Sequence, residues 1–348
     1  MSRIRILVVD DSPLIREIII KILEKDPEFF VVGQAENGSE AIRLTQNFRP
    51  DLIIMDLYMP VMDGFQAIEK IMAYHPTPIL VATSALAREG KTISFRALEL
   101  GALEVIDKPT LSPGPELTPK EIEFTTLVKM LSRVKVVSHV RGKLKRSPLE
   151  PAVQEYRAAD QFKIVAVAAS TGGPKALLHI LRGLPENLPA PIVVVQHISE
   201  GFASGLAGWL NHEAKLKVKE GAKGEELKAG TMYIAPTGFH MVVNSSRRIA
   251  FNSGPPIMSH RPSGTILLKS VADSFGPRTI GVILSGMGSD GAEGILEIKI
   301  RGGKTIAQAE SDCVVFGMPK AAIELGAVDK VLPLDLIAAE IIRILGEI

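Results

Sequence analysis

The chain has 348 residues, of which 46% are hydrophobic and 23% charged, so the composition predicts a globular protein of about two domains. A formal net charge of +1 gives no overall support for nucleic-acid binding, and no apolar run approaches the roughly 20 residues of a membrane span. The single cysteine, Cys313, excludes an intramolecular disulfide, and the chain reaches Asp10 too soon for a signal peptide, so we expect a cytoplasmic protein without membrane insertion.

The first 109 residues alternate apolar runs with helix-like segments. This alternation is typical of a parallel sheet that is covered by helices on both faces. The expected strands are Ile6–Val9, Leu52–Met55, Ile79–Ala82 and Val105–Asp107, and the expected helices are Ser12–Lys25, Ser39–Phe48, Gly64–Tyr74, Gly90–Leu100 and, after Pro119, Glu121–Leu131.

Polar side chains stand at the ends of these strands: Asp10-Asp11, Asp56, Thr83 and Lys108. The carboxyl ends of parallel strands meet at one edge of the sheet, so we expect these groups to share a crevice. Two carboxylates about 4 Å apart repel by roughly 4 kcal/mol at an effective dielectric constant of 20, and a bound divalent cation would remove that cost. Ligands that offer only oxygen atoms suit Mg²⁺.

Asp56 stands alone at its strand end, which leaves Asp10 and Asp11 for the metal. We therefore predict that Asp56 accepts a phosphoryl group, with Lys108 and the metal neutralising its charge and Thr83 donating a hydrogen bond. Taken alone, Asp10-Asp11 is also compatible with a helix N-cap, and Lys108 with an unrelated surface charge.

Residues 1 to 125 resemble a response-regulator receiver domain of flavodoxin-like fold. The resemblance implies the strand order 2-1-3-4-5, and it implies that the backbone carbonyl of Tyr58 joins the three aspartates around Mg²⁺. One departure is Val105, because receivers usually carry Phe or Tyr three residues before the lysine. The segments that carry the resemblance are Val9-Asp10-Asp11-Ser12, Met55-Asp56-Leu57-Tyr58-Met59-Pro60, Asp63-Gly64 and Lys108-Pro109.

Residues 126–160 lose this periodicity and are predicted to form a basic interdomain linker. A run of positive charges of this kind is usually solvated, although it could contact an acidic partner. Its basic residues are Arg133, Lys135, Arg141, Lys143, Lys145 and Arg146, and Pro148 and Pro151 follow them.

A second α/β pattern occupies residues 161–348, so the predicted fold class is α/β with two doubly wound parallel-sheet domains. Around Asn244-Ser245-Ser246 the spacing between residues 232 and 251 indicates an inserted hairpin. The expected strands are Ile164–Ala168, Ile192–Val195 and Thr279–Leu284, and the expected helices are Lys175–Leu184, Phe202–Glu213, Ser263–Ser274 and Gly291–Ile300.

The first strand of this second domain runs into Ala169-Ser170-Thr171-Gly172-Gly173-Pro174, a turn of small residues that opens a helix. A serine on such a turn lies near helix N-terminal amides, which can hold an oxyanion. Two further strands are followed by His197 and by a loop that contains Asp290. A nucleophile, a base and an orienting carboxylate thus follow strands of one domain, as a Ser-His-Asp triad requires.

These residues also have other interpretations. The turn at Ser170 could bind phosphate, although it lacks the Gly-Lys-Ser/Thr of a P-loop. His197 could be a hydrogen-bonded core histidine, and Asp290 could be a helix N-cap. His240 and His260 are rival bases in loop-like contexts, so the spacing alone leaves the triad and these alternatives open.

Residues 161–348 resemble the catalytic domain of the chemotaxis protein-glutamate methylesterases, the CheB family, and the order of receiver, linker and catalytic domain matches too. The resemblance implies that Ser170 is the nucleophile, His197 the general base and Asp290 its orienting partner. It also makes Thr171 and the backbone amide of Met287 candidates for the oxyanion hole. The matching segments are Ala169–Pro174, Val195–His197, Tyr233–Pro236, His260–Ser263, Gly286–Gly291 and Phe316–Pro319.

One position and one segment of this domain depart from the family pattern. Ala168 stands where the family often has Gly, and after Ser263 the usual Val-Asp-Val-Leu-Phe is replaced by Gly264-Thr265-Ile266-Leu267-Leu268. The second change could reshape the substrate rim, to which we assign Arg261.

The resemblance implies a phosphorylation-regulated hydrolase that demethylates glutamate γ-methyl esters of chemoreceptors and deamidates receptor glutamines. Its partners would be methylated chemoreceptors and a phosphodonor histidine kinase. Mg²⁺ would serve the receiver only, with no cofactor for ester hydrolysis. The alternatives are a phospho-dependent adaptor and a receiver-linked hydrolase of another ester. Only the basic linker supports a regulator that binds nucleic acid, so we expect no nucleic-acid partner.

Overall fold

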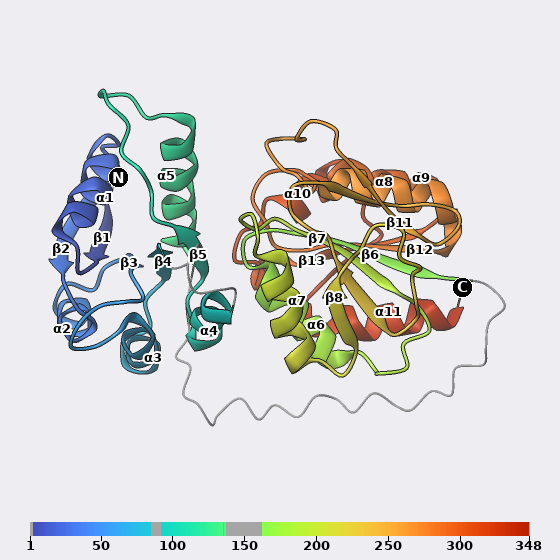
Figure 1. Cartoon of the computed structure of the whole chain (residues 1–348), viewed down its shortest axis with the longest axis horizontal. Coiled ribbons are helices and arrows are strands. Elements are labelled where there is room, and N and C mark those ends of the chain that lie inside the picture. Colours follow the sequence, from blue (N-terminus) through green and yellow to red (C-terminus); the bar gives the residue numbers. More distant parts are fainter. Residues whose placement is uncertain (1–2, 85–91, 135, 137–161, 348) are drawn as a thin grey trace. The chain divides into compact units, whose positions relative to one another are not determined.

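We analysed a computed structural model of the chain, which describes residues 3–84, 92–134, 136 and 162–347. It divides into two compact units, Met1–Arg146 and Ser147–Ile348 (Figure 1). Most of the predicted basic linker, including Lys135 and residues 137–160, lies outside the described residues. Among the described helices, none has the length and apolar character needed to cross a membrane.

The first unit contains a five-stranded parallel sheet in the order β2-β1-β3-β4-β5, as the receiver resemblance implied. Its central strands consist of aliphatic residues that are almost fully buried, because helices cover both faces of the sheet (Figure 1). The strands are β1 (Ile4–Val9), β2 (Phe29–Ala35), β3 (Leu52–Met55), β4 (Ile79–Thr83) and β5 (Glu104–Asp107).

Side chains that accept hydrogen bonds from backbone amides define where several helices of this unit begin. Ser12, Asn37, Asp63 and Thr118 each accept a bond from an amide of the first helical turn. The helices are α1 (Pro13–Glu24), α2 (Gly38–Phe48), α3 (Gly64–Tyr74), α4 (Thr92–Leu100) and α5 (Pro119–Leu131).

Two predicted boundaries need comment. Helix α5 continues to Leu131, so the predicted end of the receiver at residue 125 falls inside a helix, and the segment 126–131 is not linker. The capping box of Thr118 and Glu121 places the start of α5 at Pro119, before the predicted Glu121. The predicted start of the preceding helix at Gly90 lies outside the described residues.

The second unit contains a seven-stranded parallel sheet in the order β14-β13-β12-β6-β7-β9-β8. The three predicted strands form its centre, where β6 pairs with both β7 and β12. The strands are β6 (Ile164–Ala169), β7 (Ile192–Gln196), β8 (Lys217–Glu220), β9 (Thr231–Ile234), β12 (Thr279–Ile283), β13 (Lys304–Gln308) and β14 (Lys330–Leu332).

Helices pack on both faces of this second sheet, with α8, α9 and α10 on one face and α6, α7 and α11 on the other (Figure 1). The predicted hairpin exists as the antiparallel pair β10 (His240–Val243) and β11 (Ile249–Asn252). The helices are α6 (Gly173–Gly183), α7 (Ala203–Glu213), α8 (Gly264–Phe275), α9 (Ala292–Ile300), α10 (Met318–Glu324) and α11 (Leu334–Glu347).

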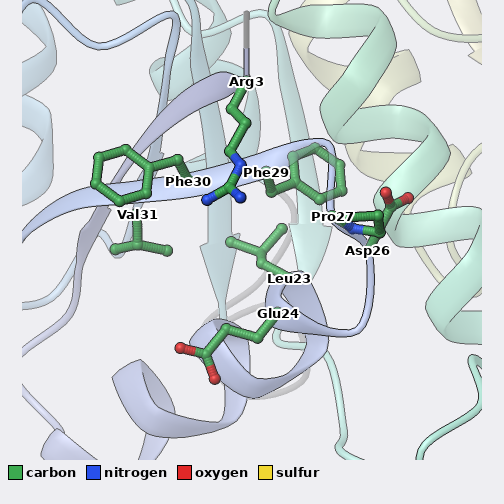
Figure 2. Close-up of a pocket in the computed structure, with 8 residues that line it drawn as sticks. All are labelled: Arg3, Leu23, Glu24, Asp26, Pro27, Phe29, Phe30 and Val31. Atoms are coloured by element: carbon green, nitrogen blue, oxygen red, sulfur yellow. The ribbon is translucent and has the colours of Figure 1, made fainter. Parts of the chain in front are cut away.

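A pocket of about 380 Å³ lies in the first unit beside the end of α1 and the start of β2 (Figure 2). Leu23 and Phe29 contribute apolar side chains, and Arg3, Glu24 and Asp26 contribute charged ones. Because Phe29 pairs with Ile4, the first residue of β1, this pocket lies at the amino ends of the strands. It is therefore at the opposite edge of the sheet from the predicted acidic site.

Candidate functional sites

The strand ends of the first unit bring the predicted acidic residues together. Carboxylate oxygens of Asp10, Asp11 and Asp56 all lie within 4.8 Å of one another. Lys108 Nζ is 2.7 Å from Asp10 Oδ2 and 2.9 Å from Asp56 Oδ2, so it bridges two of the three carboxylates. Asp10 and Asp56 are buried and Asp11 is exposed, which leaves the cluster accessible from one side.

The electrostatics of this cluster reflect three carboxylates around one ammonium group. Burial raises the pKa of Asp10, and the nearby charge of Asp56 raises it further, while the hydrogen bond from Lys108 opposes both. Burial opposes the charged form of Lys108 as well, but hydrogen bonds to Asp10 and Asp56 raise the pKa of its ammonium group. Three hard oxygen ligands whose like charges crowd one another fit a divalent cation such as Mg²⁺.

The backbone holds Asp56 tightly at this site. Its Oδ1 accepts a 2.8 Å hydrogen bond from the amide of Leu57, and its own amide donates to Val9 of the neighbouring strand. Helix α3 begins so close that a Cβ on Gly64 would lie 2.1 Å from the Asp56 carbonyl oxygen. Only glycine permits this close approach of α3 to the Asp56 carbonyl oxygen, and the approach fixes the backbone of Asp56 at the end of β3.

The other residues assigned to the receiver lie on or just after its strands β3, β4 and β5. Thr83 is buried at the end of β4, between the strands that carry Asp56 and Lys108. Tyr58 is half exposed, and its ring meets the edge of Phe65 at a centroid distance of 6.4 Å. Val105 is partly buried on β5, where it pairs with β4 and packs against the apolar core of this unit.

In the second unit, Ser170 follows β6 on a turn that lies against a second loop. Its amide donates to the carbonyl oxygen of Ser285, and its carbonyl oxygen accepts a 2.7 Å bond from Gly173, the first residue of α6. A Cβ on Gly286 would lie 2.7 Å from Ser170 Cβ, so the loop after β12 contacts the serine directly. The serine is 8% exposed, which makes this small-residue turn a nearly buried site with an opening.

His197 and Asp290 meet beside this turn. His197 Nε2 lies 2.7 Å from Asp290 Oδ2, and the amide of His197 donates to Ala169, the last residue of β6. Since an ionised carboxylate only accepts hydrogen bonds, the proton of a neutral His197 is on Nε2 and Nδ1 carries the lone pair. Nδ1 is buried and has no hydrogen-bond partner among the described residues, so it is available to accept a proton.

Asp290 receives four hydrogen bonds. Besides His197, its donors are the Ser263 hydroxyl at 2.7 Å and the amides of Gly264 at 2.6 Å and Thr265 at 3.0 Å. Burial acts to raise the pKa of Asp290, but the bonds from His197 and Ser263 outweigh it and hold the pKa well below its ordinary value. Asp290 precedes α9 without capping it, because Gly291 occupies the N-cap position.

The two rival histidines differ in their surroundings. His240 is fully buried, with Nδ1 accepting the amide of Ser263 at 3.1 Å and Nε2 donating to the carbonyl oxygen of Pro255 at 3.0 Å. Both nitrogens are thus occupied, and His240 anchors the loop that supplies Ser263. The ring of His260 lies flat on His197, with centroids 3.8 Å apart and an interplanar angle of 11°.

The oxyanion-hole candidates flank Ser170. In the part of the chain that the structure describes, neither the amide of Thr171 nor that of Met287 donates a hydrogen bond. Both belong to the two loops that meet at the serine. The candidate rim residue Arg261 is exposed next to His260 and donates to the carbonyl oxygen of Gly254.

Besides Ser263, two further residues have a part in this site although no role was predicted for them from the sequence. The Gln196 amide donates 2.8 Å bonds to the carbonyl oxygens of Ser170 and His197, which ties the two loops together. The Ser285 hydroxyl donates to the carbonyl oxygen of Thr171 and accepts the amide of Val315. Their positions at strand ends were visible in the sequence, but any polar residue there could have pointed elsewhere.

Fold and site geometry together define a two-domain α/β protein that joins a receiver-type acidic site to a serine, histidine and aspartate of the kind found in hydrolases. The family described as response regulator receiver domain matches residues 6–114, and the family described as CheB methylesterase matches residues 165–341. This chain belongs to the CheB methylesterase family.

Relatives match over nearly the whole chain. A protein-glutamate methylesterase/protein-glutamine glutaminase of Anaeromyxobacter dehalogenans is 46% identical over 345 residues, covering 99% of this chain and 97% of its own. One from Pyrococcus abyssi is 40% identical, covering 98% and 93%. The crystal structure of the Thermotoga maritima CheB methylesterase catalytic domain superposes with a TM-score of 0.51 and 43% identity, covering 53% of this chain and 98% of that one.

Proposed function

We propose that this protein hydrolyses glutamate γ-methyl esters of chemoreceptors, and deamidates receptor glutamines, under the control of phosphorylation at Asp56. The names of relatives 46% and 40% identical over nearly their full length support this reaction class. The single observation that carries the proposal is the 2.7 Å contact between His197, which follows β7, and Asp290, on the loop after β12. Both lie at the carboxyl end of the sheet, where Ser170 follows β6.

In the proposed reaction, Ser170 Oγ attacks the γ-carbonyl carbon of the receptor ester while His197 Nδ1 takes the hydroxyl proton. His197 then carries a positive charge, which the carboxylate of Asp290 stabilises through Nε2. His197 returns the proton to the methoxide oxygen, so methanol leaves and an acyl-enzyme remains. Water attacks this ester in the same way and releases glutamate and Ser170.

The tetrahedral intermediate places a negative charge on the former carbonyl oxygen. The amides of Thr171 and Met287, which make no other hydrogen bond within the described chain, are the proposed donors to it. A glutamine side chain would follow the same steps, with ammonia as the leaving group.

In the receiver, Asp56 is the proposed acceptor of the phosphoryl group from a histidine kinase. Its carboxylate oxygen would form a bond to phosphorus as the bond to the donor's histidine nitrogen breaks. Mg²⁺ held by Asp10, Asp11, Asp56 and the Tyr58 carbonyl would neutralise charge on the phosphoryl oxygens. Lys108 supplies a second positive charge beside Asp56, and Thr83 the proposed hydrogen bond.

We assign the receiver function to the first unit through Leu131 and the esterase function to residues 161–348. Regulation follows if the unphosphorylated receiver restrains the esterase. The isolated fragment 161–348 should then demethylate receptors faster than the unphosphorylated whole chain. An equal or slower rate would reject restraint by the receiver.

The direct test measures methanol release from methylated chemoreceptor in membranes, with and without acetyl phosphate and Mg²⁺. We expect release that rises on phosphorylation, that loses its rise in Asp56→Asn, and that disappears in Ser170→Ala. Phosphorylation of Asp56 should persist in the Ser170→Ala variant, which controls for the receiver, and thermal unfolding of the variant controls for folding of the second unit. Release that survives in Ser170→Ala would reject the serine as nucleophile, and a folded wild type without any release would favour the adaptor alternative.

A further inference from the structure

A tight turn places a second imidazole on His197. Ile257 and His260 exchange two backbone hydrogen bonds of 3.0 and 2.8 Å, so the chain reverses between them through Met258 and Ser259. Both turn residues have positive φ, the conformation that closes a two-residue hairpin. The Ser289 hydroxyl contacts Met258 Sδ at 3.4 Å, so this turn is joined to the loop that carries Asp290.

The contact between the two rings is flat and close. Their centroids are 3.8 Å apart and their planes differ by 11°, whereas His197 makes its bond to Asp290 through the edge of its ring. A hydrogen bond at one edge leaves a ring free to tilt about a line through the bonded nitrogen. A second flat ring against its face opposes that tilt, because tilting would break the stack or press the rings together.

We propose that His260 is a positioning residue, whose ring fixes the plane of His197 and thereby aims Nδ1 at the nucleophile Ser170. This inference rests on the proposed function, in which Nδ1 takes the serine proton. Nδ1 of His197 has no hydrogen-bond partner in the described chain, so no hydrogen bond at that nitrogen fixes the orientation of the ring.

His260 is suited to stacking at neutral pH. Burial, together with the neighbouring His197, lowers the pKa of its imidazole to about 4, although Asp290 acts in the opposite direction. The ring is therefore neutral when His197 gains its proton during the reaction, and the two rings do not repel each other as two cations would. The same low pKa makes His260 a poor acceptor for the serine proton.

The test compares His260→Phe, which keeps a flat ring, with His260→Leu, which fills a similar volume without one. Both substitutions leave the backbone bonds to Ile257 in place. We expect kcat for methanol release within about threefold of wild type for His260→Phe and about tenfold lower for His260→Leu, with KM unchanged in both. Thermal unfolding of both variants shows whether they are equally folded.

The rate at which a fluorophosphonate probe labels Ser170 is the second readout, because it needs the activated serine but no receptor. Labelling should follow the same order, with Leu slowest. Wild-type labelling without methanol release would reject the proposed substrate and still test the stack. If Leu matches wild type, or if Phe is as slow as Leu, the positioning role is wrong. If His260→Leu fails to fold, His260→Gln takes its place in the comparison with Phe.

Discussion

Replacing Asp290 with Asn tests the geometry around His197 most directly. An asparagine side chain offers one acceptor oxygen and one donor amide where the carboxylate accepts four hydrogen bonds. If the asparagine oxygen faces His197, the asparagine NH2 group lies against the backbone N–H of Thr265, and two donors meet. If the NH2 group faces His197, it lies against the backbone N–H of Gly264. In that second orientation the imidazole proton must move to Nδ1, where it prevents His197 from accepting the serine proton.

The size of the effect follows from the distance. A carboxylate and an imidazolium 2.7 Å apart attract each other by roughly 6 kcal/mol at an effective dielectric constant of 20. In the proposed reaction this attraction exists only after His197 gains the serine proton, so its loss should raise the barrier and leave the ground state unchanged. Roughly 6 kcal/mol corresponds to a decrease in kcat of about 10⁴-fold, the size seen when serine proteases lose this charge.

The assay measures kcat and KM for methanol release in Asp290→Asn, and the matched control is Asp335→Asn. Asp335 pairs with His179 on the surface, and its side chain is 68% exposed, so its loss should leave the rate unchanged. A decrease of less than tenfold in the Asp290 variant, with KM unchanged and the protein folded, would refute the role of the carboxylate.

Stability gives Asp290→Asn a second signature. One buried amide loses its acceptor, which costs about 1–3 kcal/mol in the free energy of unfolding. The folded-state pKa of Asp290 is depressed, so its stabilisation is complete above the unfolded pKa of about 4 and is lost as the pH falls toward the folded value. The difference between wild type and variant, measured by urea unfolding, should therefore shrink below about pH 4.

Three further substitutions test the supporting structure. Gly64→Ala places a Cβ 2.1 Å from the Asp56 carbonyl oxygen. Phosphorylation by acetyl phosphate should therefore slow, and the free energy of unfolding of the receiver should fall by about 1–3 kcal/mol. An unchanged phosphorylation rate would contradict this. Gly173→Ala places one 2.0 Å from Gln196 Oε1, so kcat should fall, whereas Gly208→Ala, which meets nothing within 4 Å, should not change it. Glu121→Gln breaks the buried pair with Lys25 and should cost about 3 kcal/mol at pH 7. Despite burial, hydrogen bonds from backbone amides and Lys25 lower the pKa of Glu121 to about 2. The destabilisation by Glu121→Gln should therefore decrease between about pH 4.5 and pH 2, and urea unfolding that shows the same destabilisation at every pH would contradict this.

Several strands and helices near the end of the second domain were not predicted from the hydrophobic pattern of the sequence. The strands β13 and β14 and the helices α10 and α11 were not among the predicted elements, and the edge strand β14 has only three residues. A short edge strand has little apolar pattern of its own, because it is covered on fewer sides than the central strands. The central strands were predicted because burial on both faces requires uninterrupted Val, Ile and Ala.

The sequence by itself determined the fold class and the residues at the strand ends, since parallel strands must bring their carboxyl ends to one edge. Only the tertiary structure supplied the contacts that distinguish His197, His240 and His260 and that support His197 as the proposed base. In the structure, Asp290 accepts a hydrogen bond from His197, both ring nitrogens of His240 have hydrogen-bond partners, and the ring of His260 stacks on the ring of His197. These contacts join residues 15 or more positions apart, and their distances and ring orientations depend on loop paths that local pattern does not encode.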